Sequence, residues 1–397
     1  MKHLSICRLL LCGLIAPVAP LTAQTWTQTA APSSSWYALA ASADGSKLVV
    51  AIGGANAGGI FTSSNSGTTW LPTTAPVTNW FAIASSADGV KLVAVAGGGP
   101  TIKGLIYTSA NSGLTWAATS APSNYWYTVA SSADGTKLVA GGSRNKVAPL
   151  YSSTNSGVTW VSNNIVPMNW RALATSPDGS KIIALAGGNS GGIFISTNFG
   201  GNWTSNAAPN PQLQAIAASA DMTKMVAVTY GPSPGPIYTS INSGGTWTQT
   251  IAPNNYWASV AASADGSRLV AVASVGGIYT STDAGANWTS NNLSVAAWNA
   301  VASSADGGKL AAAVNGGGIY TARTTPPPAL NVSPAGLNLT LSWIVPSTNY
   351  TLLQSSNLSA TTWLNVPIVP SLNLSNLHYE VSLPAPPGNA FYRLKTP

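Results

Sequence analysis

This chain of 397 residues is poor in the side chains that most enzymes use for chemistry. It has two cysteines, two histidines and one glutamate, and charged residues make up only 6% of it. Cys7, Cys12 and His3 lie near the N-terminus, whereas His378 and Glu380 lie near the C-terminus. The long middle of the chain therefore lacks the groups for Ser–His–Asp catalysis, for a zinc site and for thiol chemistry.

The aspartates of the middle region stand in recurrent motifs. Seven of them occupy an S-A-D-type motif: Asp44, Asp88, Asp134, Asp178, Asp221, Asp265 and Asp306. An aspartate can bond the backbone two residues further on, and the glycine that usually follows accepts a positive φ. We interpret these residues as structural turns, and we expect no catalytic pair of carboxylates, no metal site and no cofactor.

A tryptophan recurs through most of the chain at intervals of 41 to 46 residues. The series is Trp26, Trp70, Trp116, Trp160, Trp203, Trp247 and Trp288. A period in this range indicates one supersecondary unit copied many times. In one unit the apolar runs between turn residues predict strands at Phe81–Ser85, Lys91–Val95, Leu105–Ser109 and Thr115–Ser120. Four strands per unit indicate the blade of a β-propeller.

A second recurrent motif, S-x-N-x-G-x-x-W, ends at each tryptophan of the series from Trp70 onward. It resembles the Asp-box, or BNR repeat, of sialidases, sortilin-type receptors and photosystem II assembly-factor propellers. In those families the motif is structural, so the resemblance implies the fold and no activity. Sialidases of this fold use an arginine triad, a tyrosine with a partner glutamate and an acidic general acid. The propeller region here contains no glutamate.

The ends of the repeat region predict how the circle closes. There are seven S-A-D-type motifs but only six copies of the second motif, so the last unit lacks a fourth strand. Thr25–Pro32 matches Thr246–Pro253 almost residue for residue, and we expect this N-terminal segment to supply that strand. Pairing the two ends leaves no open edge. The predicted fold is all-β: a seven-bladed β-propeller of four-stranded blades over 24–324, followed by a small β-sandwich domain.

The start of the chain resembles an export signal. In residues 1–23, the basic residues Lys2 and Arg8 come before the apolar run Leu9–Ala16. This order is typical of a cleaved signal peptide. A membrane anchor is the competing interpretation, but the run is too short to span a bilayer. We therefore expect a secreted or periplasmic protein, exported in the bacterial manner.

The end of the chain lacks the repeat. Residues 325–334 read as a Pro-rich linker. Residues 335–397 resemble small fibronectin type III-like modules through the patterns L-x-L-S-W, Y-x-L-x-x-S and F-Y-R-L. We predict strands at Leu337–Trp343, Tyr350–Ser355, Trp363–Val366, Tyr379–Leu383 and Ala390–Leu394.

Six units carry a second tryptophan ten residues after the first, and the fifth unit has Leu213 there. This second Trp ring comprises Trp36, Trp80, Trp126, Trp170, Trp257 and Trp298. Each stands at the start of the predicted innermost strand, near the mouth of the channel on the face formed by the variable loops. Two interpretations remain open. The indoles either pack between blades, or they expose a platform for a sugar or a peptide.

Four basic residues add an asymmetry on that same face. Lys103, Arg144, Lys146 and Arg171 should form a basic arc over three neighbouring blades. If the arc is functional rather than scattered solvated charge, the ligand is anionic. Most other bases follow a turn aspartate by three residues and balance its charge, whereas a nucleic-acid binder would show denser clustering.

The sequence thus favours a secreted, non-enzymatic, monomeric binding or scaffold protein without a membrane span, whose ligand is a glycan or a protein. The first alternative is a divergent sialidase-like glycoside hydrolase or lyase. The second is an assembly factor for a membrane protein complex.

Overall fold

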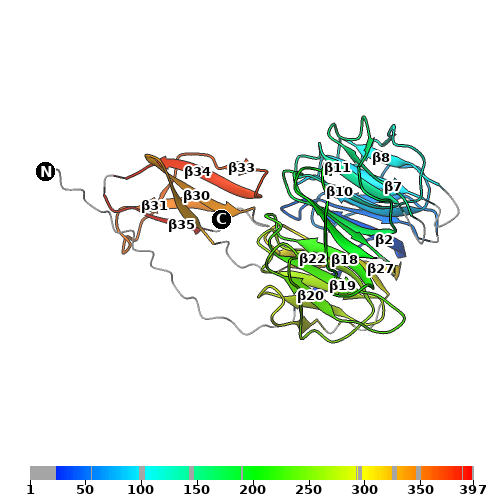
Figure 1. The fold of residues 1–397 in the computed structure, drawn as a ribbon. Coiled ribbons are helices and arrows are strands. Elements are labelled where there is room, and N and C mark those ends of the chain that lie inside the picture. Colours follow the sequence, from blue (N-terminus) through cyan, green and yellow to red (C-terminus); the bar gives the residue numbers. More distant parts are fainter. Residues whose placement is uncertain are drawn as a thin grey trace.

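The computed structural model of the chain describes residues 24–54, 56–97, 103–142, 147–188, 191–291, 293, 297–323, 329–345, 350–386 and 388–395. These residues form strands and turns and contain no helix, so no described helix could cross a membrane. The predicted signal peptide, 1–23, lies outside the described residues. Figure 1 shows a large body of radially arranged sheets with a smaller domain beside it.

Each blade is an antiparallel meander in which consecutive strands pair in order from the channel outward. Blade 1 comprises β2 (Ser34–Ala41), β3 (Leu48–Ile52), β4 (Ile60–Ser63) and β5 (Leu71–Pro72). Blade 2 comprises β6 (Trp80–Ser85), β7 (Leu92–Ala96), β8 (Ile106–Ser109) and β9 (Ala117–Ala118). Blade 3 comprises β10 (Trp126–Ser131), β11 (Leu138–Gly142), β12 (Leu150–Ser153) and β13 (Val161–Ser162).

The next three blades repeat this plan. Blade 4 comprises β14 (Trp170–Thr175), β15 (Ile182–Ala186), β16 (Gly192–Ser196) and β17 (Thr204–Asn206). Blade 5 comprises β18 (Leu213–Ala218), β19 (Met225–Thr229), β20 (Ile237–Ser240) and β21 (Thr248–Gln249). Blade 6 comprises β22 (Trp257–Ala262), β23 (Leu269–Ala273), β24 (Ile278–Ser281) and β25 (Thr289–Ser290).

The seventh blade is built from both ends of the propeller. It comprises β26 (Trp298–Ser303), β27 (Lys309–Gly317), β28 (Ile319–Arg323) and, as its outermost strand, β1 (Trp26–Gln28). β1 pairs antiparallel with β28, with Trp26 opposite Ala322. The predicted seven-bladed propeller, closed by its N-terminal strand, is confirmed.

The fourth strands are shorter than predicted. In blade 2 the strand covers Ala117–Ala118 rather than Thr115–Ser120. Thr115 belongs to the preceding turn, because its N–H donates to Asn111 Oδ1 at 2.9 Å instead of joining the strand ladder.

The connections define two faces. The turns between strands one and two and between strands three and four share one face, here called the turn face. In the first kind of turn, Asp44 Oδ1 accepts from Ser46 N at 3.0 Å and from Ser42 Oγ at 2.6 Å. In the second, Asn65 Oδ1 accepts from Thr69 N at 2.9 Å. The remaining loops, from strand two to three and from strand four to the next blade, share the opposite loop face.

A ring of backbone hydrogen bonds joins the blades at the turn face. In six of the seven blades the residue before the turn aspartate donates its N–H to the carbonyl of its counterpart in the next blade, at 2.6–2.8 Å. The members of this ring are Ala43, Ala87, Ala133, Pro177, Ala220, Ala264 and Ala305. Pro177 has no N–H, so it cannot donate to Ala220. The ring therefore has one gap, between blades 4 and 5.

The C-terminal tail domain is a β-sandwich of two sheets. One sheet has the order β29 (Asn331–Ala335), β30 (Asn338–Ile344), β34 (His378–Pro384) and β33 (Ser371–Asn373). The other has the order β32 (Leu364–Asn365), β31 (Thr351–Ser355) and β35 (Phe391–Lys395). The sheets enclose a core around Trp343. The residues of β29 pair with β30, so the tail domain starts at Asn331, inside the predicted linker 325–334. Neither β29 nor β33 was predicted from the sequence.

Ring closure yields a first prediction. Trp26 is 7% exposed and packs in the core between blades 6 and 7, whereas Thr27 on the same strand is exposed. Trp26→Ala should lower the free energy of unfolding by about 3–5 kcal/mol through the lost burial and the cavity left behind. Thr27→Ala should change it by less than about 0.5 kcal/mol. Urea denaturation of both variants measures the difference, and equal effects would contradict closure by β1.

Candidate functional site

The second Trp ring is buried, which corrects the proposed ligand platform. Trp36, Trp80, Trp126, Trp170, Trp257 and Trp298 are each at most 2% exposed. Trp80, for example, fills the gap between blades 1 and 2, among Ala38, Ala51 and Ile60 of one blade and Ile83 of the other. These tryptophans therefore hold the propeller together and are not available to stack on a ligand.

An aromatic contact fixes each indole, which meets the aromatic ring of the third strand in its own blade, as in the pair of Trp80 and Tyr107, whose centroids are 5.3 Å apart. In four of the six the N–H also donates to a backbone carbonyl, as Trp170 Nε1 does to Ala148 O at 2.7 Å. Nε1 of Trp126 and of Trp298 has no hydrogen-bond partner among the described residues. A buried indole with its polar edge satisfied seals the wedge between two sheets.

A β-bulge follows the apolar anchor on the innermost strand of every blade. In blade 1, Trp36 pairs with Ile52 and Ala38 pairs with Ala51, so Tyr37 is the extra residue between them. A bulge redirects a side chain out of the regular alternation. The seven extra residues form the mouth ring at the loop-face end of the inner strands: Tyr37, Phe81, Tyr127, Arg171, Gln214, Ala258 and Asn299.

Members of the mouth ring contact one another across blade boundaries. The rings of Tyr37 and Phe81 lie 5.5 Å apart, and those of Phe81 and Tyr127 lie 5.7 Å apart. Arg171 Nη1 donates to Gln214 Oε1 at 3.2 Å. Asn299 Nδ2 donates to the carbonyl of Tyr37 at 3.4 Å. The mouth thus has an aromatic arc over blades 1 to 3. A polar arc of Arg171, Gln214 and Asn299 lies on blades 4, 5 and 7, and blade 6 contributes Ala258.

The structure describes two of the four residues of the predicted basic arc, Lys103 and Arg171. Arg171 belongs to the mouth ring; its side chain is half-buried, and its Nε has no hydrogen-bond partner among the described residues. Lys103 is exposed on the rim, where its Nζ lies 6.0 Å from the centroid of the Tyr125 ring. Arg144 and Lys146 lie outside the described residues. On the loop face, Arg171 therefore lies half-buried at the channel mouth, and Lys103 lies on the exposed rim.

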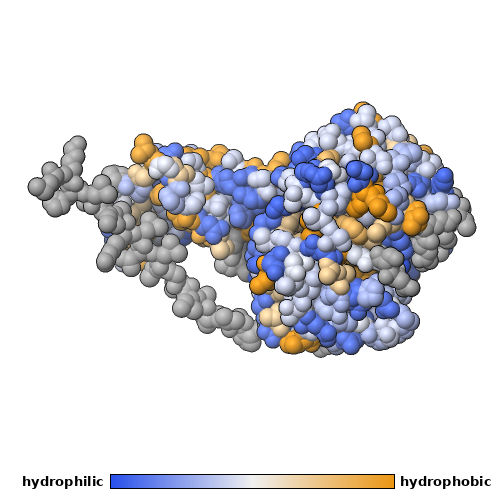
Figure 2. Space-filling model, in the orientation of Figure 1, coloured by the Kyte–Doolittle hydropathy of each residue, from blue (hydrophilic) through white to orange (hydrophobic). Residues whose placement is uncertain are grey.

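Exposed apolar side chains surround the mouth on the loops. This apolar rim comprises Val77, Val147, Val166, Tyr230, Ile251 and Val275, which are 48–75% exposed. Figure 2 shows that exposed hydrophobic side chains on the visible side of the propeller form separate patches among hydrophilic ones.

All eight propeller aspartates lie in the turns of the opposite face. Asp134 is typical: burial raises the pKa of its carboxyl, but hydrogen bonds from Ser132 and Thr136 together with the charge of Lys91 outweigh burial and hold the pKa below its usual value. The same balance lowers the pKa of Asp44, Asp178, Asp221 and Asp265. In these five cases the base comes from the preceding blade, so electrostatic attraction acts across five of the blade junctions.

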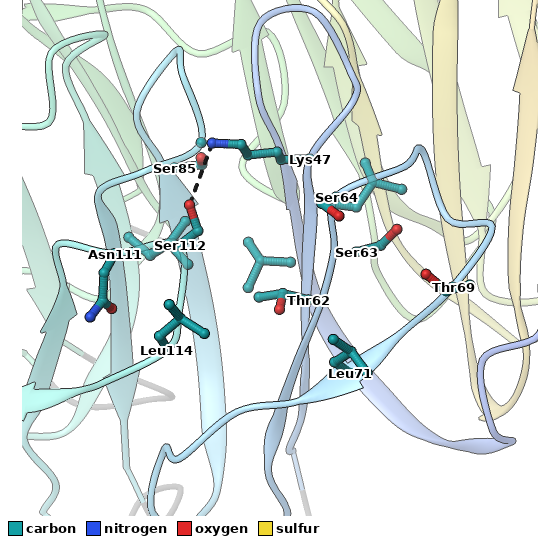
Figure 3. Close-up of a pocket in the computed structure, with 14 residues that line it drawn as sticks. Lys47, Thr62, Ser63, Ser64, Thr69, Leu71, Ser85, Asn111, Ser112 and Leu114 are labelled. Carbon is teal, nitrogen blue, oxygen red and sulfur yellow. Dashed lines mark hydrogen bonds between the residues drawn. The ribbon is translucent and has the colours of Figure 1, made fainter.

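A separate cavity of about 290 Å³ lies between blades 1 and 2 on the turn face. Figure 3 shows Lys47 at one end of it and Leu71 and Leu114 at the other. Lys47 Nζ already donates to Ser112 Oγ at 3.4 Å, and Lys91 contacts Ser156 in the same way at the next junction. Smaller spaces of about 10 Å³ lie at the corresponding places between blades 5 and 6, 6 and 7, and 7 and 1, so the position of this cavity follows from the repeat. Among the described residues, no cluster of His, Cys, Asp or Glu could hold a metal ion.

Sequence reasoning missed the mouth ring. Its members directly follow the second Trp ring, at the one inner-strand position where the units differ in chemistry, from Tyr37 to Arg171 to Asn299. Variation within an otherwise regular repeat was the available signal. Strict alternation along the strand gave no reason to place these side chains at the channel.

Comparison with known proteins shows the fold. No protein-family model and no curated protein matches the chain. The GH74 xyloglucanase from Xanthomonas campestris has a TM-score of 0.60 at 15% identity, over 81% of this chain and 59% of that enzyme. YCF48 from Cyanidioschyzon merolae has a TM-score of 0.58 at 15% identity, over 76% of this chain and 99% of that one.

Two further structures are similar. YCF48 bound to D1 peptide has a TM-score of 0.58 at 13% identity, over 78% of this chain and 99% of that one. Hydrazine synthase of Kuenenia stuttgartiensis has a TM-score of 0.60 at 12% identity, over 74% and 97%. These neighbours are β-propellers, and identities this low establish a shared fold alone. The chain spans about three-fifths of the xyloglucanase.

The turn carboxyls predict how stability depends on pH. Their folded pKa values lie below the unfolded value of about 3.9, so their stabilising contribution is present above that pH and is lost as the pH falls through the folded values. The free energy of unfolding should therefore decrease below about pH 4. Asp134→Asn should reduce this dependence, as measured by urea denaturation from neutral to acid pH. An unchanged acid slope in the variant would contradict the assignment.

Proposed function

We propose that this chain is an exported, non-enzymatic protein that binds an acidic peptide or protein segment at the mouth ring on its loop face. The observation that carries the proposal is the mouth ring itself. In it the half-buried side chains of Tyr37 and Tyr127 pack on either side of the buried Phe81 and share the ring with Arg171 and Gln214. Aromatic side chains supply contact area, and an arginine fork recognises carboxylates.

The charge distribution supports an anionic ligand. Every aspartate of the propeller stands in a turn of the turn face, and the propeller has no glutamate. The loop face therefore carries bases, including Lys103 and Arg171, without a carboxylate to balance them. An unbalanced positive surface attracts acidic partners, and the attraction weakens as salt screens it.

The apolar rim favours a peptide over a sugar. Val77, Val166 and Ile251 offer aliphatic contacts around the mouth, which suit the side chains of a polypeptide. The similar fold of YCF48 occurs in a structure bound to D1 peptide, so a propeller of this kind can take a peptide ligand. At 13% identity this likeness supports a peptide as the class of ligand, but it does not indicate which residues of this chain would bind it.

A glycoside hydrolase is the alternative raised by the fold likeness to a xyloglucanase. Glycoside hydrolysis usually needs two carboxylates beside the scissile bond. The turn aspartates are bonded within their own turns, as Asp134 is to Ser132 and Thr136. The pKa of Asp134 is lowered rather than raised, so this carboxyl is poorly suited to act as a general acid. The tail carboxylate, Glu380, accepts from the side chains of Asn373 and Asn376 at 2.9 Å.

The test is a binding screen against synthetic peptides and against acidic and neutral glycans. We expect peptides that combine acidic and apolar residues to bind, with an affinity that falls as salt is raised. Tyr127→Ala with Arg171→Ala should weaken binding at least about tenfold, equivalent to about 1.4 kcal/mol. Leu114→Ala is the matched control, because Leu114 is 72% exposed on the turn face and should leave the affinity unchanged.

Three outcomes would contradict the proposal. They are equal affinity of the double variant and the parent, binding confined to neutral glycans, and turnover of a glycan. Co-purification of a membrane complex would favour an assembly factor, and the same variants would then report whether the mouth ring holds that complex.

A further inference from the structure

The turn-face end of the central channel is surrounded by small side chains. Each blade contributes the last residues of its inner strand and the start of its S-A-D turn, such as Ser42, Ala43, Ala133 and Ala264. The backbone ring of hydrogen bonds passes through these residues. Together they line a cavity of about 210 Å³.

One residue from outside the propeller lines this cavity. It is Leu377, the last residue of the turn between β33 and β34 of the tail domain. The side chain is half-buried. The neighbouring residue, His378, is close enough to the blade 6 turn for the charge of Asp265 to act on it. The tip of the β33–β34 hairpin therefore lies over the channel.

The tail domain holds Leu377 in an unusual backbone conformation. Its φ is 57°, in the left-handed region that non-glycine residues rarely adopt. Two backbone bonds maintain it: Leu377 N donates to Asn373 O at 2.9 Å, and Val345 N donates to Leu377 O at 2.8 Å. A strained position that is held on both sides presents its side chain in one direction.

The path of the chain favours the same arrangement. β28 ends at Arg323, which pairs with Lys309 just after the last S-A-D turn. The chain therefore leaves the propeller on the turn face. The tail domain begins at Asn331. Eight residue steps reach at most about 30 Å, so the tail stays near the turn face. Such a short tether raises the effective concentration of the hairpin at the channel.

We propose that the tip of the β33–β34 hairpin is a stopper built into the chain, with Leu377 seated over the ring of small residues. The partner of this surface is the protein's own tail domain. The channel is then closed at the turn face and open at the mouth ring, so a ligand enters from the loop face alone. This proposal does not depend on which ligand the mouth ring binds.

The test measures how fast a thiol inside the channel reacts. Cys7 and Cys12 are changed to serine in the full chain, and Ala220→Cys places a single thiol among the residues that line the cavity. The rate of maleimide addition is followed by mass spectrometry. We expect Leu377→Gly, which tolerates the left-handed backbone but removes the side chain, to raise this rate by about tenfold or more, as expected when a protecting contact is lost.

The control is Leu337→Ala, because Leu337 lies in the same domain and is 91% exposed. It should leave the rate unchanged. Leu377→Asn, which also tolerates the left-handed conformation, is the second variant should the glycine variant fold poorly, and it should also raise the rate. Equal rates in the parent and in a well-folded Leu377 variant would overturn the proposal. So would a parent rate equal to that of a thiol placed at Leu337.

Discussion

An extra residue in the innermost strand of every blade sets both the packing and the chemistry of this propeller. The register shift lets Trp36 and its counterparts point into the gap between blades, where they are at most 2% exposed. It also turns the next residue toward the mouth of the channel. One backbone irregularity, repeated in each blade, therefore separates a structural ring from a ring whose chemistry varies. The first could not be changed without opening the core, whereas the second, apart from the buried Phe81, consists of half-buried side chains that can be adapted to a ligand.

The two faces of the propeller have different tasks. The turn face holds the Asp turns, the ring of backbone hydrogen bonds and the charge pairs that run from blade to blade. The chain also leaves the propeller there, after Arg323, and the tail hairpin reaches the channel from that side. The loop face carries the mouth ring, the apolar rim and unbalanced bases. A binding role fits the loop face, because the contacts that join the blades and the tail hairpin lie on the turn face.

Most of the fold could be predicted from the sequence, because its signals are local and repeated. The Trp period, the turn motifs and the match of Thr25–Pro32 to Thr246–Pro253 indicated the blades and their closure. The length of the fourth strands could not be read in this way, since Asn111 captures the N–H of Thr115 through a side-chain bond. The site was harder to predict. The full burial of Trp170 and the direction of the half-buried Arg171 depend on a bulge, and a bulge breaks the alternation on which strand prediction relies.

The central claim is that the mouth ring is where a ligand binds. Hydrogen–deuterium exchange of the full chain, with and without the tightest-binding peptide from the screen, tests it most directly. We expect slower exchange in the loop-face segments around Tyr37, Phe81 and Tyr127 and unchanged exchange in the turns around Asp88 and Asp134. Protection confined to the turns, with the mouth segments unaffected, would contradict it.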